Sequence, residues 1–554
     1  MANIQKSCRQ CKAKFEITDE DVKFYEKVSP VFGGKKYQIP APTLCPECRQ
    51  QRRLAFRNER KLYHRKCDLT GKEIISMYSS DKKIKVYDRE EWWTDKWNPL
   101  EYGRDFDFSR PFFEQFKELL EAVPRIALNN KDPYNSEYCN FSLQNKDCYL
   151  LSSSGFNESC YYCRRAFKSR DCCDCSTIES CELCYEIIDS DNCYQGAWLQ
   201  NCSNCRDCYL GYNLRGCSDC FGCANLTQKK FCIFNIQYSE EEYKKRVGEL
   251  RKNMPMAQKE FEKIKLQAVR KNISGLQFEN CSGDALFNSK NSFYCFENRD
   301  IQDCKYLANT RDMKDSCDVN NDDHSELAYE CIGSDSNYMH CFSDICWFNS
   351  DDYYTSLCFN SKNIFGCVSL KKNQYCILNK QYIKEEYEKL VPQIIEHMKK
   401  NGEWGEFPPL SLSPFGYNES MAQEYFPLEK EDVLKIGGKW QDENSSNRYE
   451  GPKIKVSTDI SKVEDDLVKQ ILFCESCNKN YKIILQELNF YRRMSLPVPT
   501  VCPDCRYKDR MALRNPRKLW SRTCAKCKAE IQTSYAPERP EIVYCESCYL
   551  KEVY

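Results

Sequence analysis

The sequence has few histidines, no net charge and no long apolar run. Among its 554 residues are four His, and 82 basic residues balance 82 acidic ones, so the whole molecule has no field that would attract nucleic acid or a membrane. No run of about 18 apolar residues occurs, and the N-terminal MANIQKSCRQ lacks the apolar core of a secretion signal. We therefore expect a soluble, cytoplasmic protein with reduced thiols and no membrane partner.

Cysteine, by contrast, is abundant, with 40 residues in the chain. So many thiols in a chain of this length indicate bound metal, disulfides or a repeated packing role. The absence of a secretion signal disfavours disulfides. The chain is also longer than one hydrophobic core usually supports, so several domains are expected.

The two ends of the chain are related copies of one module. Residues 43–91 align without a gap with residues 500–548, and TLCPECRQQRRLAFRN matches TVCPDCRYKDRMALRN. Upstream of each copy lies a Cys-x-x-Cys pair, followed by Phe-Tyr and a Pro-x-Pro-Thr turn. Two such pairs can surround one tetrahedral Zn²⁺, because both sulfurs of each pair face the same ion.

This spacing predicts three zinc ions, each bound by four cysteines. The N-terminal module holds one site and the C-terminal module holds two. The ligands are Cys8, Cys11, Cys45 and Cys48 in the first site, Cys474, Cys477, Cys502 and Cys505 in the second, and Cys524, Cys527, Cys545 and Cys548 in the third. Sites closed by four thiolates are structural rather than catalytic.

The N-terminal copy lacks a counterpart of the third site. The alignment places Cys67, Thr70, Asp88 and Glu91 opposite its four cysteines. Because Thr is a poor ligand for zinc, we expect a degenerate site whose hairpin is held by packing.

The second Cys pair of each module is expected to open a short helix with a basic face, because Cys-Pro begins it and arginines recur every fourth residue. The basic residues concerned are Arg49, Arg53, Arg57, Arg60, Lys61, Arg506, Arg510, Arg514, Arg517 and Lys518. A basic helix on a zinc site predicts binding to RNA, DNA or a ribonucleoprotein. The alternative is that these arginines neutralise the zinc–thiolate centres, or pair with acidic groups of the protein itself or of a protein partner.

The arrangement of Cys-x-x-Cys, Phe-Tyr, Pro and Cys-Pro-x-Cys-Arg resembles the short zinc-ribbon domains of bacteria. The whole layout is similar to the large cysteine-rich zinc-ribbon proteins of candidate-phyla bacteria. The resemblance covers most of the chain and implies zinc binding. Some proteins of that kind are labelled CaiB/BaiF-like, after the class III CoA-transferases, but this sequence contains no recognisable nucleotide-binding segment to support CoA transfer.

The cysteine-rich middle of the chain is a repeat. Cys139, Cys160, Cys181 and Cys202 recur every 21 residues, and 16 of the 17 cysteines between positions 139 and 232 are separated by multiples of three, with Cys173 as the exception. This pattern favours a β-solenoid with coils of about 20 residues, whose interior the thiols fill. A serial metal array is the alternative.

A second repeat follows the first. KKFCIFNIQYSEEEY at 229–243 recurs as NQYCILNKQYIKEEY at 373–387, and the region before this second copy keeps fewer cysteines. Since the repeat survives the loss of thiols, its cysteines are expected to pack rather than to bind metal.

We therefore expect a mainly β, multidomain protein with two β-solenoid (β-helix) arrays, helical caps, and zinc-ribbon or treble-clef-like modules at both ends. A helix at 110–123 is expected to cap the start of the first array. The expected segments are an N-terminal zinc-ribbon module at 1–98, a helical cap or linker at 99–133, the first solenoid at 134–238, a helical cap or linker at 239–272, the second solenoid at 273–381, a helical cap at 382–400, an extended Pro/Gly/aromatic arm at 401–465, and a C-terminal double zinc-ribbon module at 466–554.

No phosphate loop, dinucleotide fingerprint or nucleophile signature appears in the sequence. The leading hypothesis is a non-enzymatic zinc protein, a scaffold that presents two basic modules to RNA, DNA or a ribonucleoprotein. A protein-interaction scaffold whose basic helices dock on its own solenoids or on an acidic partner is the first alternative. A thiol redox or metal-buffering protein is the second.

Overall fold

The computed structural model describes residues 3–442, 454 and 456–553, which form two compact units. Each unit combines segments that lie far apart in the sequence. Unit 1 comprises Met1–Leu128, Ile273–Asp442 and Arg517–Leu519, and unit 2 comprises Asn129–Asn272, Glu443–Pro516 and Trp520–Tyr554. Unit 1 therefore joins the N-terminal module to the second repeat, and unit 2 joins the C-terminal module to the first.

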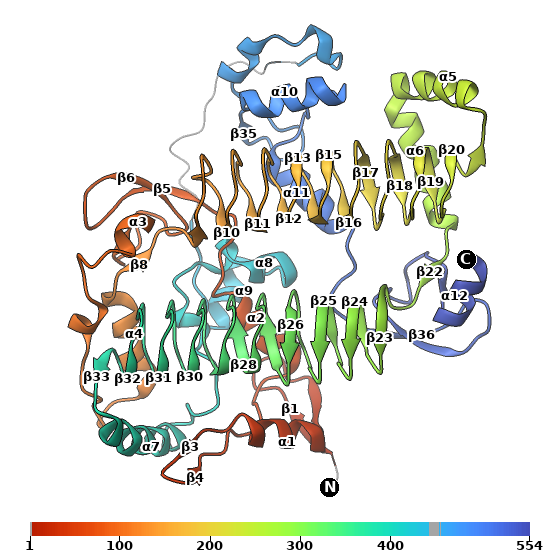
Figure 1. The fold of residues 1–554 in the computed structure, drawn as a ribbon. Coiled ribbons are helices and arrows are strands. Elements are labelled where there is room, and N and C mark those ends of the chain that lie inside the picture. The colour runs from red at the N-terminus through yellow and green to blue at the C-terminus, as the bar shows by residue number, and fades with distance from the viewer. Residues whose placement is uncertain (1–2, 443–453, 455, 554) are drawn as a thin grey trace. The chain divides into compact units, whose positions relative to one another are not determined.

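Unit 2 contains a 13-stranded sheet, which we call the first array (Figure 1). Its strands are parallel, and each residue pairs with one 12 positions further on, as Asn140 pairs with Ser152 and Ser152 with Arg164. The last pair of strands is antiparallel. The strands are β9 (Asn130–Lys131), β10 (Asn140–Leu143), β11 (Ser152–Gly155), β12 (Arg164–Phe167), β13 (Arg170–Cys173), β14 (Ser176–Glu179), β15 (Glu182–Tyr185), β16 (Ile188–Asp191), β17 (Ala197–Gln200), β18 (Tyr209–Tyr212), β19 (Ser218–Ala224), β20 (Lys230–Ile233) and β21 (Ile236–Gln237).

Unit 1 contains an 11-stranded sheet of the same kind, the second array. Tyr338 pairs with Ser350 and Ser350 with Lys362, again 12 residues apart. The strands are β23 (Gly275–Glu279), β24 (Gly283–Lys290), β25 (Cys295–Gln302), β26 (Arg311–Lys314), β27 (Cys317–Asn320), β28 (Glu326–Ile332), β29 (Tyr338–Cys341), β30 (Ser350–Tyr353), β31 (Lys362–Phe365), β32 (Gln374–Ile377) and β33 (Lys380–Gln381).

The 12-residue register corrects the predicted coil of about 20 residues. In both arrays the backbone adopts the left-handed region at nearly every third residue, for example at Asp147, Leu150 and Ser153, with φ of 53°, 53° and 50°. Asn and Asp tolerate this conformation better than most residues, which accounts for their frequency at these positions. The residue after each such position points inward. Cysteines therefore recur at any multiple of three, and the interval of 21 is one such multiple without being a full coil.

Thiols fill the interior of the first array. The buried core contains 16 cysteines together with Leu, Ile and Ala side chains. Each thiol donates to nearby backbone carbonyls, as the Sγ of Cys172 does to the carbonyl oxygen of Arg170 at 3.3 Å. Cysteine suits this position because it is small and apolar and still offers a weak donor. Within the part of the chain that the structure describes, no three thiols of the first array gather as metal ligands.

Helices follow both arrays, as predicted. The first array is followed by α5 (Glu240–Leu250) and α6 (Met254–Gln267), and the second by α7 (Lys384–Lys400). Ser239 caps α5 by accepting a hydrogen bond from the Glu242 backbone, as expected for a capping residue. Among the described residues, every helix is too short or too polar to cross a lipid bilayer.

The helix at 110–123 differs from its expected placement. It forms as α4 (Phe112–Ala122), but Phe112 packs its ring 5.2 Å from that of Tyr354 and 5.6 Å from that of Phe365, both in the second array. The apolar stripe was predicted correctly, but periodicity alone does not tell which array a stripe covers.

The N-terminal module is built from hairpins and short helices. Its elements are β1 (Ile4–Ser7), β2 (Lys14–Ile17), α1 (Asp19–Lys27), β3 (Val31–Phe32), β4 (Lys35–Lys36), α2 (Pro46–Leu54), β5 (Tyr63–Lys66), β6 (Glu73–Ser76), β7 (Val86–Tyr87), α3 (Arg89–Trp92) and β8 (Arg125–Ile126). The expected helix after Cys-Pro is α2, with Pro46 as its first residue.

The C-terminal module repeats this plan in unit 2. Its elements are β34 (Leu472–Phe473), β35 (Asn480–Tyr481), α10 (Leu485–Met494), α11 (Pro503–Ala512), β36 (Trp520–Thr523), β37 (Glu530–Thr533), β38 (Val543–Tyr544) and α12 (Glu546–Val553), and β38 pairs with β22 (Arg270–Lys271). The helix α11 is the counterpart of α2.

The segment expected as an extended arm at 401–465 is well packed over residues 401–442. It has irregular backbone with two short helices, α8 (Met421–Tyr425) and α9 (Lys430–Lys435). Trp404, Phe407 and Phe415 are buried in unit 1. The ring of Phe407 lies 5.1 Å from that of Phe56, so the segment straps the N-terminal module in place. Positions 443–453 and 455 of this predicted arm lie outside the described residues.

Candidate metal centres

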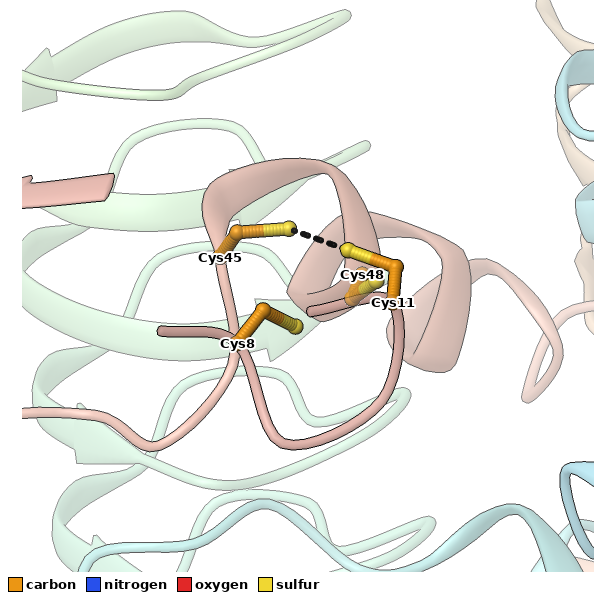
Figure 2. A group of neighbouring side chains, drawn as sticks. All are labelled: Cys8, Cys11, Cys45 and Cys48. Atoms are coloured by element: carbon orange, nitrogen blue, oxygen red, sulfur yellow. Dashed lines mark hydrogen bonds between the residues drawn. The ribbon is translucent and has the colours of Figure 1, made fainter. Parts of the chain in front are cut away.

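The first predicted tetrad is assembled by a hairpin and a helix start. Cys8 and Cys11 lie in the turn between β1 and β2, and Cys45 and Cys48 lie at the first turn of α2. Their four Sγ atoms lie within 4.8 Å of one another, and those of Cys11 and Cys45 are 3.6 Å apart, as Figure 2 shows. Four sulfurs converging in this way are the donor set of a structural zinc site.

The C-terminal module forms the second and third tetrads in the same way. In each, the four Sγ atoms lie within 4.8 Å of one another. The Sγ atoms of Cys477 and Cys502 are 3.7 Å apart, as are those of Cys527 and Cys545. The structure thus brings together every cysteine of the three predicted tetrads into groups that could hold a metal ion.

All three tetrads use the same tight turn to aim the first Cys pair. One residue after the second cysteine of that pair has left-handed backbone, namely Lys12, Asn478 and Lys528 with φ of 62°, 55° and 65°. This turn directs backbone N–H groups toward the sulfurs. The result is a pocket that favours thiolates before any ion is present.

Hydrogen bonding in these turns prepares the thiols for metal binding. Burial opposes ionisation of Cys474, but backbone N–H donors of Cys502, Cys477 and Ser476 outweigh it and lower the pKa to about 6. The pKa of Cys524 is lowered to about 6 by the equivalent donors. In the first tetrad, a hydrogen bond from Cys48 is the main cause that lowers the pKa of Cys45 to about 5. Metal binding requires thiolates, so these shifts favour it.

The degenerate position of the N-terminal module does not gather its four residues. Cys67 is buried, and its Sγ accepts a hydrogen bond from the Asp88 backbone at 3.2 Å. The Asp88 carboxylate caps α3, while Glu91 pairs with Lys96 at 2.6 Å. Within the described residues these groups form no cluster of potential metal ligands. The hairpin stays folded through the indole of Trp92, which is fully buried.

The arginine face of α2 lies against the second array. Arg49 is 1% exposed and Arg53 is 0% exposed. Arg49 contacts the Asp318 carboxylate at 2.8 Å, and Arg53 contacts Glu330 at 2.8 Å. Burial alone would raise the pKa of Asp318, but the two guanidinium groups outweigh it, so the pKa is lowered.

The arginine face of α11 lies against the first array in the same manner. Arg506 contacts Asp174 at 2.7 Å and Arg510 contacts the same carboxylate at 2.8 Å. Arg510 also reaches Glu186 at 3.1 Å. A further buried carboxylate, Glu487 of α10, lies 3.0 Å from Arg506. The guanidinium groups of this helix are therefore fully engaged within unit 2.

These two interfaces are copies of each other. Asp174 and Asp318 lie 144 residues apart, as do Glu186 and Glu330, and this is also the spacing between the two copies of the KKFCIFN sequence. The aromatic partners correspond as well. Arg49 lies 5.4 Å from the ring centre of Tyr306, and Arg506 lies 5.1 Å from that of Tyr162, at equivalent array positions.

Cys173, the exception to the rule of three, belongs to this interface. It is fully buried, and its Sγ lies 3.8 Å from the hydroxyl of Tyr491 in α10. Its counterpart 144 residues on is Cys317, which is 3% exposed. Both cysteines follow the inward position by one residue, so they point out of the array toward the docked module.

The structure places the ten predicted phosphate-contacting residues in two groups. Arg49, Arg53, Arg57, Arg506 and Arg510 are buried, and the side chains of Arg514 and Arg517 are each 5% exposed. Arg60 is partly exposed, and Lys61 and Lys518 are exposed. A spacing of four residues correctly predicts one face, but the same face covers the array, so most of its charge is not presented to solvent.

Sequence reasoning missed the acidic partners of these arginines. Asp318 is 269 residues from Arg49, and no local motif marks it. The available signal was the internal alignment, because acidic residues recur at 174 and 318 and again at 186 and 330.

The chain matches no protein-family model. A comparison with curated proteins finds no relative either. Inferences about function therefore depend on the geometry of the tetrads and of the arginine interfaces.

Proposed function

We propose that this protein is a non-enzymatic, zinc-binding scaffold in which two zinc-held arginine helices lock the end modules onto two β-solenoid arrays. In this proposal the end modules are zinc ribbons, and the arrays are solenoids with 12-residue coils. The constant parallel register supports the solenoid assignment, and the paired Cys turns support the zinc ribbons.

The observation that carries the proposal is the matched interface. In unit 1 Arg49 meets Asp318, and in unit 2 Arg506 meets Asp174, with both partners at equivalent places in their module and array. Buried ion pairs are costly to form unless the geometry is held rigid. Two internal copies that keep the same pairs indicate that docking is the task of the arginine face.

Zinc supplies the rigidity that this docking requires. Arg49 directly follows Cys48 in α2, and Arg506 directly follows Cys505 in α11. An ion bound by the first turn of the helix fixes the position of each guanidinium group relative to the rest of the module. Loss of zinc is therefore expected to release the arginine face from the array.

Limited digestion with trypsin tests this coupling, because trypsin cleaves after arginine. The double variant C474S/C477S should make α11 cleavable after Arg506 and Arg510, while α2 in unit 1 stays resistant. The matched control is C524S/C527S, which removes one zinc from the same module without touching the arginine helix. Equal protection of α11 in both variants would contradict the proposal.

This proposal assigns the arginines to internal docking and the partners to the class of proteins, in a reducing compartment such as the cytoplasm. Nucleic-acid binding is the competing assignment, and Lys518, whose side chain is 54% exposed, is the kind of residue it would use. Retention on mixed RNA and DNA that weakens steeply with rising salt would favour that assignment. Loss of this retention in a K61Q/K518Q variant would identify the surface involved.

A further inference from the structure

The interior of the second array contains a polar cluster where the first array is filled by small and apolar groups. His340 and Asp352 are both 0% exposed, and so is Cys346. The positions 144 residues earlier are Gly196, Cys208 and Cys202. An imidazole and a carboxylate have thus replaced a glycine and a thiol in the core of the repeat.

The three side chains converge from two sides of one coil. His340 in β29 and Asp352 in β30 are paired in register, so their side chains stack on neighbouring strands. Cys346 lies six residues, or half of a 12-residue coil, from each of them and faces them across the interior. Their potential ligand atoms all lie within 4.8 Å of one another.

Hydrogen bonds hold the cluster as a metal site would require. The Nδ1 atom of His340 lies 2.8 Å from both carboxylate oxygens of Asp352. Its other ring nitrogen, Nε2, lies 3.1 Å from the hydroxyl of Ser334, which also accepts from the Cys346 backbone at 3.4 Å. A histidine that binds a metal through one nitrogen usually hydrogen bonds through the other, and this fixes the ring.

A second carboxylate nearby adds to the need for positive charge. Asp322 is fully buried, and its Oδ1 accepts from Ser325 at 2.7 Å, but its Oδ2 has no hydrogen-bond partner. Its counterpart in the first array is Ile178. Burying carboxylates in a core is expensive unless a cation compensates them.

We propose that His340, Cys346 and Asp352 bind a zinc ion inside the second array. A set of one nitrogen, one sulfur and one carboxylate suits Zn²⁺, and Asp352 can fill two positions by binding through both oxygens. Bonds of about 2.1 Å place two ligands of a tetrahedral ion roughly 3.3 Å apart, so binding requires Asp352 to move by about half an ångström. The chain then holds four metal ions, three in the tetrads and one in the array.

Metal counting on the full-length reduced protein tests this site. We expect four zinc ions per chain, of which a chelator removes three readily, because each tetrad contains at least one exposed or partly exposed cysteine. The fourth should stay until the second array unfolds. A count of three, with every ion removable from the folded protein, would overturn the proposal.

Two variants locate the resistant ion, and one controls for packing. H340Q and D352N should each lose the chelator-resistant ion and keep the three others. C295S changes another fully buried thiol of the same array, outside the cluster, and should keep all four. A resistant ion that persists in folded H340Q would also overturn the proposal.

Cobalt substitution of the wild-type protein gives a readout that does not depend on a variant folding. The resistant ion should lack the intense sulfur-to-cobalt charge transfer of a four-thiolate site, because it has one thiolate ligand. A four-thiolate spectrum for the resistant ion would contradict the assignment. Failure of the tetrads to bind metal would instead reduce the readily removed fraction, so the two proposals can fail separately.

Discussion

Unit 1 and unit 2 share one interface but differ in what surrounds it. Both dock an arginine helix on a carboxylate pair, Asp318 with Glu330 in one and Asp174 with Glu186 in the other. Unit 2 has two cysteine tetrads and an array core rich in thiols, whereas unit 1 has one tetrad and a core that includes polar groups. The difference teaches that the interface is the constant part of the design, while the core and the second tetrad can vary.

Removal of zinc should produce the largest effect in both units. Structural zinc sites in small domains contribute about 10–16 kcal/mol of binding free energy at neutral pH, which is more than most modules have in total stability. We expect the end modules to unfold while the arrays keep their β-sheet circular dichroism. Calorimetry with and without a chelator measures this, and joint loss of modules and arrays would show that the arrays depend on docking.

Removal of one arginine should destabilise only the unit that contains it. R49M leaves Asp318 buried without its main partner, and R506M does the same to Asp174, so each should cost about 3–5 kcal/mol. The control is R170M, which breaks an exposed pair with Glu182 and should cost less than about 1 kcal/mol. Urea unfolding followed separately in each unit measures these values. An effect of R49M on unit 2 would break the comparison.

Acidity should affect the two interfaces differently. Burial raises the pKa of Glu186 from 4.5 to about 7, despite the opposing effect of Arg510. A raised pKa means that folded unit 2 binds more protons than the unfolded chain between about pH 4.5 and 7, so this group favours folding at low pH and the benefit is lost as pH rises through 7. Relative to E186Q, wild-type unit 2 should lose on the order of 1–3 kcal/mol over that range.

The matched change in unit 1 provides the contrast. Asp318 has a lowered pKa, so its contribution is present above the ordinary aspartate pKa and is lost as pH falls below it. Denaturant unfolding of D318N and E186Q against pH would show opposite slopes relative to the wild type. Parallel slopes would contradict the assigned environments.

Exchange of a core thiol for a hydroxyl should have the smallest effect. The second array has Ser316 where the first has Cys172, and Ser316 donates to the carbonyl of Lys314 at 2.8 Å as Cys172 donates to that of Arg170. C172S can therefore keep the same hydrogen bond, and we expect a cost below about 1.5 kcal/mol. Thermal unfolding measures this. A cost above about 4 kcal/mol would mean that the thiol has a role beyond packing.

The tetrads could be predicted from sequence because their determinants are local. Two cysteines three positions apart in a turn meet one ion whatever the rest of the chain does, and the duplication supplies the partner pair. The helix after Cys45-Pro46 follows from equally local rules. These elements appear in the structure as expected.

The docking partners and the coil length could not be predicted in this way. Arg49 and Asp318 meet because the array stacks many coils, so their proximity depends on a register that no short window contains. The cysteine spacing gave the three-residue side of the coil but not the number of sides, since every multiple of three places a thiol inside. His340 was set aside as one of four unrelated histidines, because its ligands come from neighbouring coils.

The most direct test of the account is alkylation of Cys173 and Cys317, which point out of their arrays and are buried in the structure. Peptide mass spectrometry can follow them separately from the tetrad cysteines and the interior thiols. We predict that both are protected in the zinc-loaded protein and are labelled once zinc is removed, while interior thiols such as Cys172 stay protected. Continued protection of Cys173 and Cys317 in fully zinc-free protein would contradict the claim that zinc holds the arginine helices on the arrays.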